Sequence, residues 1–218
     1  MRFTFGKLSV LCLLACLSCL GQVSEGQVWE VGGSAGYSSY RNVAISSPAG
    51  QGKAGFAPGV TFSAFGGHNM YNYIGGEFRY TYTGNDLKLS AAGTEARLNG
   101  DSQTFHYDFL FHAKKRASRV RPFLAAGAGA KLYRGTGTER AVQPLIQFAA
   151  LTRTSEVQPL ISIGGGVKYT VSSHVQLRVD FRDYVTPFPK KVVAPRSHSS
   201  LSGWLHDFTP TVGISYIF

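Results

Sequence analysis

Ionisable side chains recur at every second position of several otherwise apolar segments, and this spacing points to a shared chemical environment. In the segment 175–182, Arg178, Asp180 and Arg182 alternate with valine, leucine and phenylalanine. An extended chain sends successive side chains to opposite faces, so these charges share one face of a strand. The same rule, applied along the chain, predicts nine ionisable residues that face a common interior: Glu30, Glu77, Arg79, Asp108, Lys131, Lys168, Arg178, Asp180 and Arg182.

Charges confined to a narrow interior are expected to pair, because an unpaired and desolvated charge is costly. Glu77 and Asp108 lie on segments that would be neighbours, and we expect them to meet some of Arg79, Lys131 and Arg178. One interpretation is a lumen ion-pair network that holds the interior shut. The alternative is a narrow gated pore, which the basic excess of the set would make selective for anions.

The sequence offers little for catalysis or metal binding. His106 and His112 share a face, but six residues of strand separate them by about 20 Å, so they cannot ligate one metal. His198 and Ser200, with Asp207 further on, have a spacing that resembles outer-membrane lipid A deacylases, although the surrounding residues do not match. We therefore assign no catalytic, cofactor or metal residues and expect no enzyme, with lipid A modification kept as an alternative.

The first 26 residues have the features of a signal peptide. Arg2 and Lys7 precede an apolar run over 8–20 that is too short to span a membrane as a helix, and a small-x-small cleavage site follows at 24–26. All three cysteines lie within this segment, so the expected mature chain, 27–218, has no disulfide or thiolate site. Lipidation at Cys16 is the alternative, because residues 13–16 resemble a lipoprotein processing box.

The chain carries a formal net charge of +10. For an exported protein, a basic lumen and basic rims beside anionic lipid head groups explain this charge better than nucleic acid does. The length of the expected mature chain fits one domain.

Eight segments alternate between apolar and polar residues, the pattern of strands with one apolar face. Each is long enough to cross a bilayer at a tilt, which takes ~9–11 residues. In the second segment, Phe56 and Phe62 are assigned to the apolar face. The segments lie at about 29–40, 55–68, 71–82, 103–113, 121–133, 157–171, 175–184 and 208–218.

The connections between these segments alternate in length. Those after the second, fourth and sixth segments are short, and those after the first, third, fifth and seventh run about 14 to 23 residues. Short turns at one end and long loops at the other are typical of outer-membrane barrels. Residues 86–101 are expected to extend the third and fourth segments as a hairpin.

A soluble barrel of the lipocalin type would turn its apolar face inward, and two features argue against it. Glycine on the polar face leaves room in a narrow lumen for long charged side chains, at Gly75, Gly127, Gly129, Gly164 and Gly166. Aromatic residues gather near segment ends on the apolar face, where interfacial girdles belong, at Trp29, Tyr37, Tyr82, Tyr169 and Tyr216. The sequence thus predicts an all-β fold, an eight-stranded antiparallel up-and-down transmembrane β-barrel.

Three segments, 122–129, 178–184 and 211–218, resemble small OmpA-like and OmpX-like outer-membrane barrels. In the last segment, Gly213, Tyr216 and Phe218 are spaced as in the C-terminal assembly signal of outer-membrane proteins. The resemblance covers the barrel alone, with no peptidoglycan-binding domain after it. It implies an outer-membrane location and recognition of the C-terminal strand by the barrel-assembly machinery. It also implies contact with outer-membrane lipid and lipopolysaccharide, and a monomer without cofactor or nucleic acid.

The function expected from these features is a structural or surface-interaction role through long extracellular loops above a plugged barrel. Basic residues in the third and fourth loops could bind lipopolysaccharide phosphates: Arg134, Arg140, Arg153, Lys190, Lys191 and Arg196. A narrow anion-leaning pore and a lipid A-modifying enzyme are the alternatives.

Overall fold

The computed structural model describes residues 28–69, 71–140, 142–201 and 203–218. The expected signal peptide, 1–26, and Cys16 within it lie outside the described residues. Those four ranges contain no helix that is long and apolar enough to cross a membrane.

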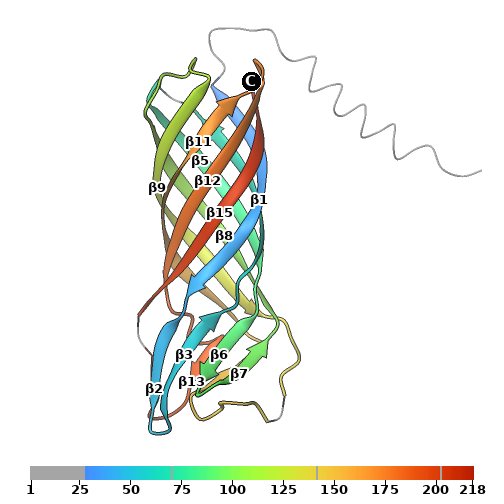
Figure 1. Ribbon diagram of the computed structural model, residues 1–218, viewed down its shortest axis with the longest axis vertical. Coiled ribbons are helices and arrows are strands. Elements are labelled where there is room, and N and C mark those ends of the chain that lie inside the picture. Colours follow the sequence, from blue (N-terminus) through green and yellow to red (C-terminus); the bar gives the residue numbers. More distant parts are fainter. Residues whose placement is uncertain (1–27, 70, 141, 202) are drawn as a thin grey trace, which may run out of the picture.

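Eight antiparallel strands form a closed barrel, so the predicted fold is confirmed. Each strand pairs with the next barrel strand along the chain, and the last pairs with the first (Figure 1). The barrel strands are β1 (Trp29–Arg41), β4 (Gly59–His68), β5 (Ile74–Gly84), β8 (Gly100–His112), β9 (Val120–Gly135), β11 (Ser155–Thr170), β12 (Val175–Pro187) and β15 (Trp204–Ile217).

The barrel has apolar side chains on its outside and polar side chains inside, the reverse of a soluble protein. Along β8, Phe105 is 58% exposed on the outside, whereas Asp108 is 0% exposed on the inside. The same alternation follows every barrel strand, because successive side chains point to opposite faces of the sheet. An apolar exterior around a polar interior is the arrangement that a lipid bilayer requires of a barrel.

The long connections at the end away from Trp29 and Phe218 are folded into further strands, which we call the cap (Figure 1). A five-stranded sheet in the order β14-β2-β3-β6-β7 is accompanied by a pair, β10-β13. The expected hairpin within 86–101 is present as β6 and β7, joined at Ala92-Gly93, where both φ angles are positive, as in a two-residue hairpin turn. The cap strands are β2 (Val43–Ser47), β3 (Gly50–Phe56), β6 (Leu87–Ala91), β7 (Thr94–Leu98), β10 (Ala149–Leu151), β13 (Val193–Pro195) and β14 (Ser200–Leu201).

The cap has an apolar core, in contrast to the polar interior of the barrel. Its buried members come from cap strands, from the loops between them and from the ends of barrel strands. The larger ones are Ile45, Phe56, Leu87, Leu89, Leu98, Tyr133, Phe148, Leu151, Phe188, Val192, Val193, Leu201 and Leu205. This core lies across the mouth of the barrel at which the cap strands begin.

The placement of Phe56 on the lipid-facing side of a strand was wrong. Phe56 ends β3, is 1% exposed, and stacks on Tyr133 with 4.9 Å between ring centres in the cap core. The expected strand 55–68 is interrupted because Pro58 has no N–H to donate to a ladder. The chain therefore leaves the cap sheet at Phe56 and enters the barrel at Gly59.

Candidate functional site

All nine residues predicted to face the interior have buried side chains inside the barrel. Glu77 on β5 lies at the centre. Arg79, two residues along the same strand, donates to its carboxylate from Nη2 at 2.8 Å, and Arg178 on β12 donates from Nη1 at 2.6 Å. Glu77 thus holds two guanidinium groups that come from two different strands.

Asp180 completes a four-membered cluster with Glu77, Arg79 and Arg178. Its carboxylate accepts a hydrogen bond from Arg79 Nη2 at 2.8 Å and pairs with Arg178 Nε at 3.0 Å. In the closed strand order, β5 and β12 are four positions apart among eight, so they lie on opposite walls. The cluster therefore spans the diameter of the barrel.

Further ion pairs extend the network on either side of this cluster. Glu30 on β1 pairs with Lys168 on β11 and, at 3.3 Å, with Arg178. Asp108 on β8 lies 3.3 Å from His106 Nε2 and 3.4 Å from Arg182 Nη2 on β12, so of the two predicted carboxylates only Glu77 meets the expected cations, Arg79 and Arg178. These contacts tie four more side chains into the lumen ion-pair network.

Two aromatic rings inside the lumen pack against the arginines. The guanidinium carbon of Arg178 lies 4.2 Å from the ring centre of Phe65 and 5.4 Å from that of Phe123. Arg79 also lies over Phe65, at 4.9 Å. Cations over aromatic faces are stabilised, most strongly where water is excluded. These rings were not among the predicted lumen residues, although Phe65 has the strand parity of the inward-facing Thr61 and Ser63.

A second cluster lies nearer the cap. Lys131 on β9 pairs with Asp207 on β15 and donates to the hydroxyl of Tyr40 at 3.0 Å. Ser38 donates a hydrogen bond to the same Asp207. Asp207 was expected to precede the last strand, predicted to begin at 208, whereas β15 begins at Trp204. Its parity with Thr209 and Thr211 would have identified it as an inward-facing residue.

Glycines stand opposite the charged side chains and make room for them. Gly127 is paired with Asp108, and a Cβ there would lie 2.3 Å from the Asp108 carboxylate and 2.0 Å from the Tyr107 carbonyl oxygen. Gly166 is paired with Asp180, and a Cβ there would lie 2.7 Å from its carboxylate. An interior that side chains already fill has no space for these methyl groups.

The nine predicted residues and Asp207 together comprise five cations and five carboxylates, because Asp207 balances the single basic excess of the predicted set. These ten residues balance in charge, while Arg121, buried at the turn end of the lumen, is held by Asn69 and two backbone carbonyls instead of a carboxylate. The ion pairs of the network cross-link opposite walls of the barrel.

The residues of the proposed assembly signal lie on β15 and directly after it. Gly213 pairs with Arg178 on one side and Ser34 on the other, so it lies between two lumen-facing side chains. Tyr216 and Phe218 are at the end of the strand that pairs with the start of β1. Phe218 is half exposed on the outside of the barrel.

The structure does not bring His198, Ser200 and Asp207 into a catalytic arrangement. Asp207 is buried in the barrel, where it binds Lys131 and Ser38, while Ser200 is exposed on β14 in the cap. The Asp207 carboxylate is therefore not available to orient His198. Across the four described ranges, no group of three or more metal-ligating side chains could hold a metal ion.

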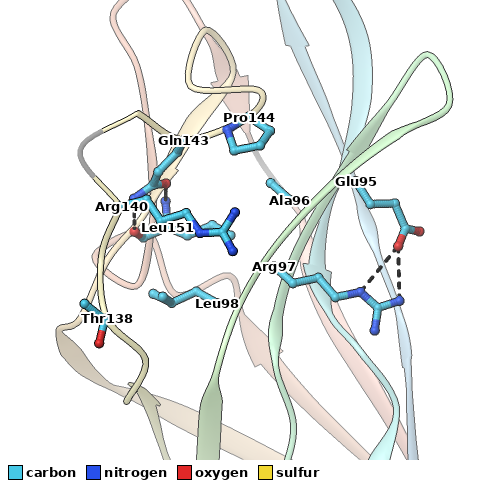
Figure 2. Close-up of a pocket in the computed structure, with 9 residues that line it drawn as sticks. All are labelled: Glu95, Ala96, Arg97, Leu98, Thr138, Arg140, Gln143, Pro144 and Leu151. Carbon is cyan, nitrogen blue, oxygen red and sulfur yellow. Dashed lines mark hydrogen bonds and ion pairs between the residues drawn. The ribbon is translucent and has the colours of Figure 1, made fainter.

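The cap contains a cleft of about 240 Å³ between β7 and the residues 138–140 and 142–144 (Figure 2). It is lined by Glu95, Ala96, Arg97, Leu98, Thr138, Arg140, Gln143, Pro144 and Leu151. On its rim, the hydrogen bond from Lys88 to the Glu95 carboxylate, followed by that from Arg97, lowers the pKa of Glu95 below its ordinary value. Both Lys88 and Arg97 pair with Glu95, at 2.5 and 3.1 Å.

Comparison with known proteins agrees with this architecture. The sequence matches the family described as outer membrane protein beta-barrel domain over residues 9–218. No curated protein matches the chain in sequence. Among solved structures, it is similar to Neisserial surface protein A, at 14% identity over 87% of this chain and 97% of that chain, with a TM-score of 0.54. It is also similar to the outer membrane protein AlkL in lipid bilayers, at 12% identity over 100% and 97% of the two chains, with a TM-score of 0.50. At these identities the likeness shows the fold.

Proposed function

The chain belongs to the outer-membrane β-barrel domain family, and from this membership we propose that it is a closed barrel supporting a folded extracellular cap that contacts the cell's surroundings. Long loops of such barrels face outward and short turns face the periplasm. The cap then lies outside the cell, and Trp29 and Phe218 lie at the periplasmic rim. The signal peptide 1–26 would direct export, and Gly213, Tyr216 and Phe218 would mark the chain for the barrel-assembly machinery.

The observation that carries the proposal is the apolar core of the cap. Loops that only connect strands in a channel protein have no reason to fold together over the barrel mouth. Here Phe56 from the cap stacks on Tyr133 from β9 and lies 5.2 Å from the ring centre of Tyr40 on β1. The cap is therefore anchored to the barrel wall and presents a rigid surface, which favours recognition because less entropy is lost on binding.

The cross-linked lumen supports a structural role for the barrel rather than transport. A pore that selects anions needs a basic path, whereas each cation of the network faces a carboxylate. The conductance of the purified protein in planar bilayers tests this part of the proposal. We expect no unitary conductance under a range of voltages. Reproducible anion-selective steps would contradict a closed barrel.

Lipopolysaccharide is the partner that we propose for the junction between barrel and cap. Arg134 and Arg153 line a shallow site there with Thr136, Thr154 and Ser155. Arg134 is held by Asp101 at 2.9 Å and remains partly exposed, while Arg153 is exposed. Guanidinium groups beside hydroxyls at this level of a barrel suit the phosphates of lipopolysaccharide.

Binding of purified lipopolysaccharide to the protein in nanodiscs tests this contact. The double variant Arg134→Gln/Arg153→Gln should bind intact lipopolysaccharide several-fold more weakly than the wild type, and dephosphorylated lipopolysaccharide should show no such difference. Lys114→Gln/Lys115→Gln is the matched control, because it removes the same charge from the short turn at the opposite rim. Equal losses in both double variants would contradict a specific phosphate site.

A further inference from the structure

The cleft in the cap lies at the free edge of the five-stranded sheet. β7 is the last strand of the order β14-β2-β3-β6-β7, and it has β6 on one side only. Figure 2 shows the cleft between this strand and the chain that carries Thr138, Arg140, Gln143 and Pro144. The cleft is therefore bounded by two walls that are distant in sequence.

The floor of the cleft is apolar. Ala96 and Leu98 are the inward-facing residues of β7, and Leu151 belongs to β10. All three are buried, and Pro144 adds a rigid apolar side to the opposite wall. An apolar fragment placed here would be removed from water on several sides, which is favourable in proportion to the area covered.

A cation extends over this floor. In Figure 2 the Arg140 guanidinium points into the space between the two walls, in front of Leu151. Its side chain has no ion pair or hydrogen bond within the described part of the chain. Arg97, in contrast, is turned toward Glu95 and donates to it from Nε and Nη2 at 3.3 and 3.1 Å. Arg140 is thus an available anion-binding group beside an apolar surface.

Both walls are fixed in place before any ligand binds. The Gln143 side chain donates to the Leu151 carbonyl at 2.8 Å and accepts from the Leu151 N–H at 2.9 Å. The Glu139 carboxylate accepts a hydrogen bond from the backbone N–H of Arg153. Glu139 and Gln143, which flank Arg140 in the sequence, are thereby bound to the segment 151–153, so little ordering of these two residues is needed on binding.

We propose that this cleft binds a small carboxylate with an apolar body, such as a two-ring aromatic or a short acyl chain. A cavity of about 150 Å³ holds benzene, and the cleft at about 240 Å³ has room for a somewhat larger body. The carboxylate would accept two parallel hydrogen bonds from Arg140. The apolar body would lie on Ala96, Leu98 and Leu151. The negative charge of Glu95 does not oppose this binding, because Lys88 and Arg97 neutralise it.

The test uses naphthoate as the probe and methyl NMR as the readout, with the full-length protein in nanodiscs. Naphthoate should shift the methyl signals of Ala96, Leu98 and Leu151 in a saturable way. The methyl signals of Leu124 and Val212, which face lipid on the barrel, should not move. Naphthylmethanol, which has the same rings and no charge, should bind about tenfold more weakly.

Arg140→Gln should weaken naphthoate binding about tenfold, roughly 1.4 kcal/mol, and leave naphthylmethanol binding unchanged. Arg153→Gln is the matched control, because it removes an exposed arginine that does not line this cleft. The absence of methyl shifts at millimolar naphthoate would overturn the proposal. So would equal naphthoate affinity in Arg140→Gln and wild type. Neither result bears on the proposed lipopolysaccharide site, which involves other residues.

Discussion

Trp29 and Phe218 exchange two backbone hydrogen bonds of 3.0 Å, and their side chains are 53% and 50% exposed on the same rim. Trp29 is the first residue of β1, and Phe218 directly follows β15. Their two hydrogen bonds thus close the barrel at the end opposite the cap. Both rings point away from the lumen at the level where aromatic residues anchor a barrel in the interface. Phe218 therefore contributes both to closure and to the contact with lipid.

Replacing Phe218 with Ser should reduce assembly in cells more than it reduces the stability of the finished barrel. The backbone bonds to Trp29 do not require the ring, whereas we propose that the assembly machinery recognises it. The heat-modifiable folded band in outer-membrane fractions should fall several-fold, while refolding into micelles stays near the wild-type yield. Phe181→Ser is the control, because Phe181 is also 50% exposed but lies within β12. An equal loss of both variants in cells would contradict a special role for Phe218.

Glu77→Gln should be strongly destabilising. The change removes the charge that two arginines on opposite walls share, so Arg79 and Arg178 keep only Asp180 and Glu30 as carboxylate partners. Removing one partner of a buried ion pair costs about 3–5 kcal/mol. Urea unfolding in lipid vesicles, followed by tryptophan fluorescence, measures the loss. Glu95→Gln, which alters an exposed ion pair in the cap, should leave the unfolding midpoint nearly unchanged, and similar losses for both would contradict the central position of Glu77.

Gly127→Ala should destabilise the barrel by about 1–3 kcal/mol, the usual cost of overpacking. Its Cβ would lie within 2.3 Å of the Asp108 carboxylate and would displace Asp108 from Arg182. Gly66→Ala is the matched control, because a Cβ at Gly66 meets no atom within 4 Å. The control should be neutral or slightly stabilising, since alanine restricts the unfolded chain. Equal unfolding midpoints in the two variants would show that the lumen accommodates the methyl group.

Acidification should loosen the β6–β7 hairpin before it affects the barrel. The Glu95 pKa is lowered in the folded protein, so its contribution to stability is complete above the ordinary value of 4.5 and disappears as pH falls through the lowered pKa. The protection factors of the amides in 87–98, which correct for the intrinsic pH dependence of exchange, should therefore fall below about pH 4.5 in the wild type. In Glu95→Gln these protection factors should not change with pH across this range. A Glu95 carboxyl that titrates at or above its ordinary pKa would contradict the prediction.

The sequence alone predicted which residues face the lumen and how many strands form the barrel. This was possible because side-chain direction in a strand is local and alternates with each residue, so that Phe105 and Asp108 are assigned to opposite faces without knowledge of any partner strand. The prediction for Phe56 was wrong because the alternation does not continue across Pro58, which separates Phe56 from the barrel strand. Asp207 was missed because the start of the last strand was set at 208, four residues after Trp204, where β15 begins.

Only the tertiary structure decided which charges pair and what the loops form. Closure of eight strands sets β5 opposite β12, and this places Arg178 beside Glu77 although 101 residues separate them along the chain. The cap likewise gathers Phe56 and Leu151 from two connections and Tyr133 from the end of a barrel strand, and it places Arg140 over Leu98 and Leu151. These contacts depend on register and closure, which are long-range properties, and the period-two pattern of a single strand carries no information about them.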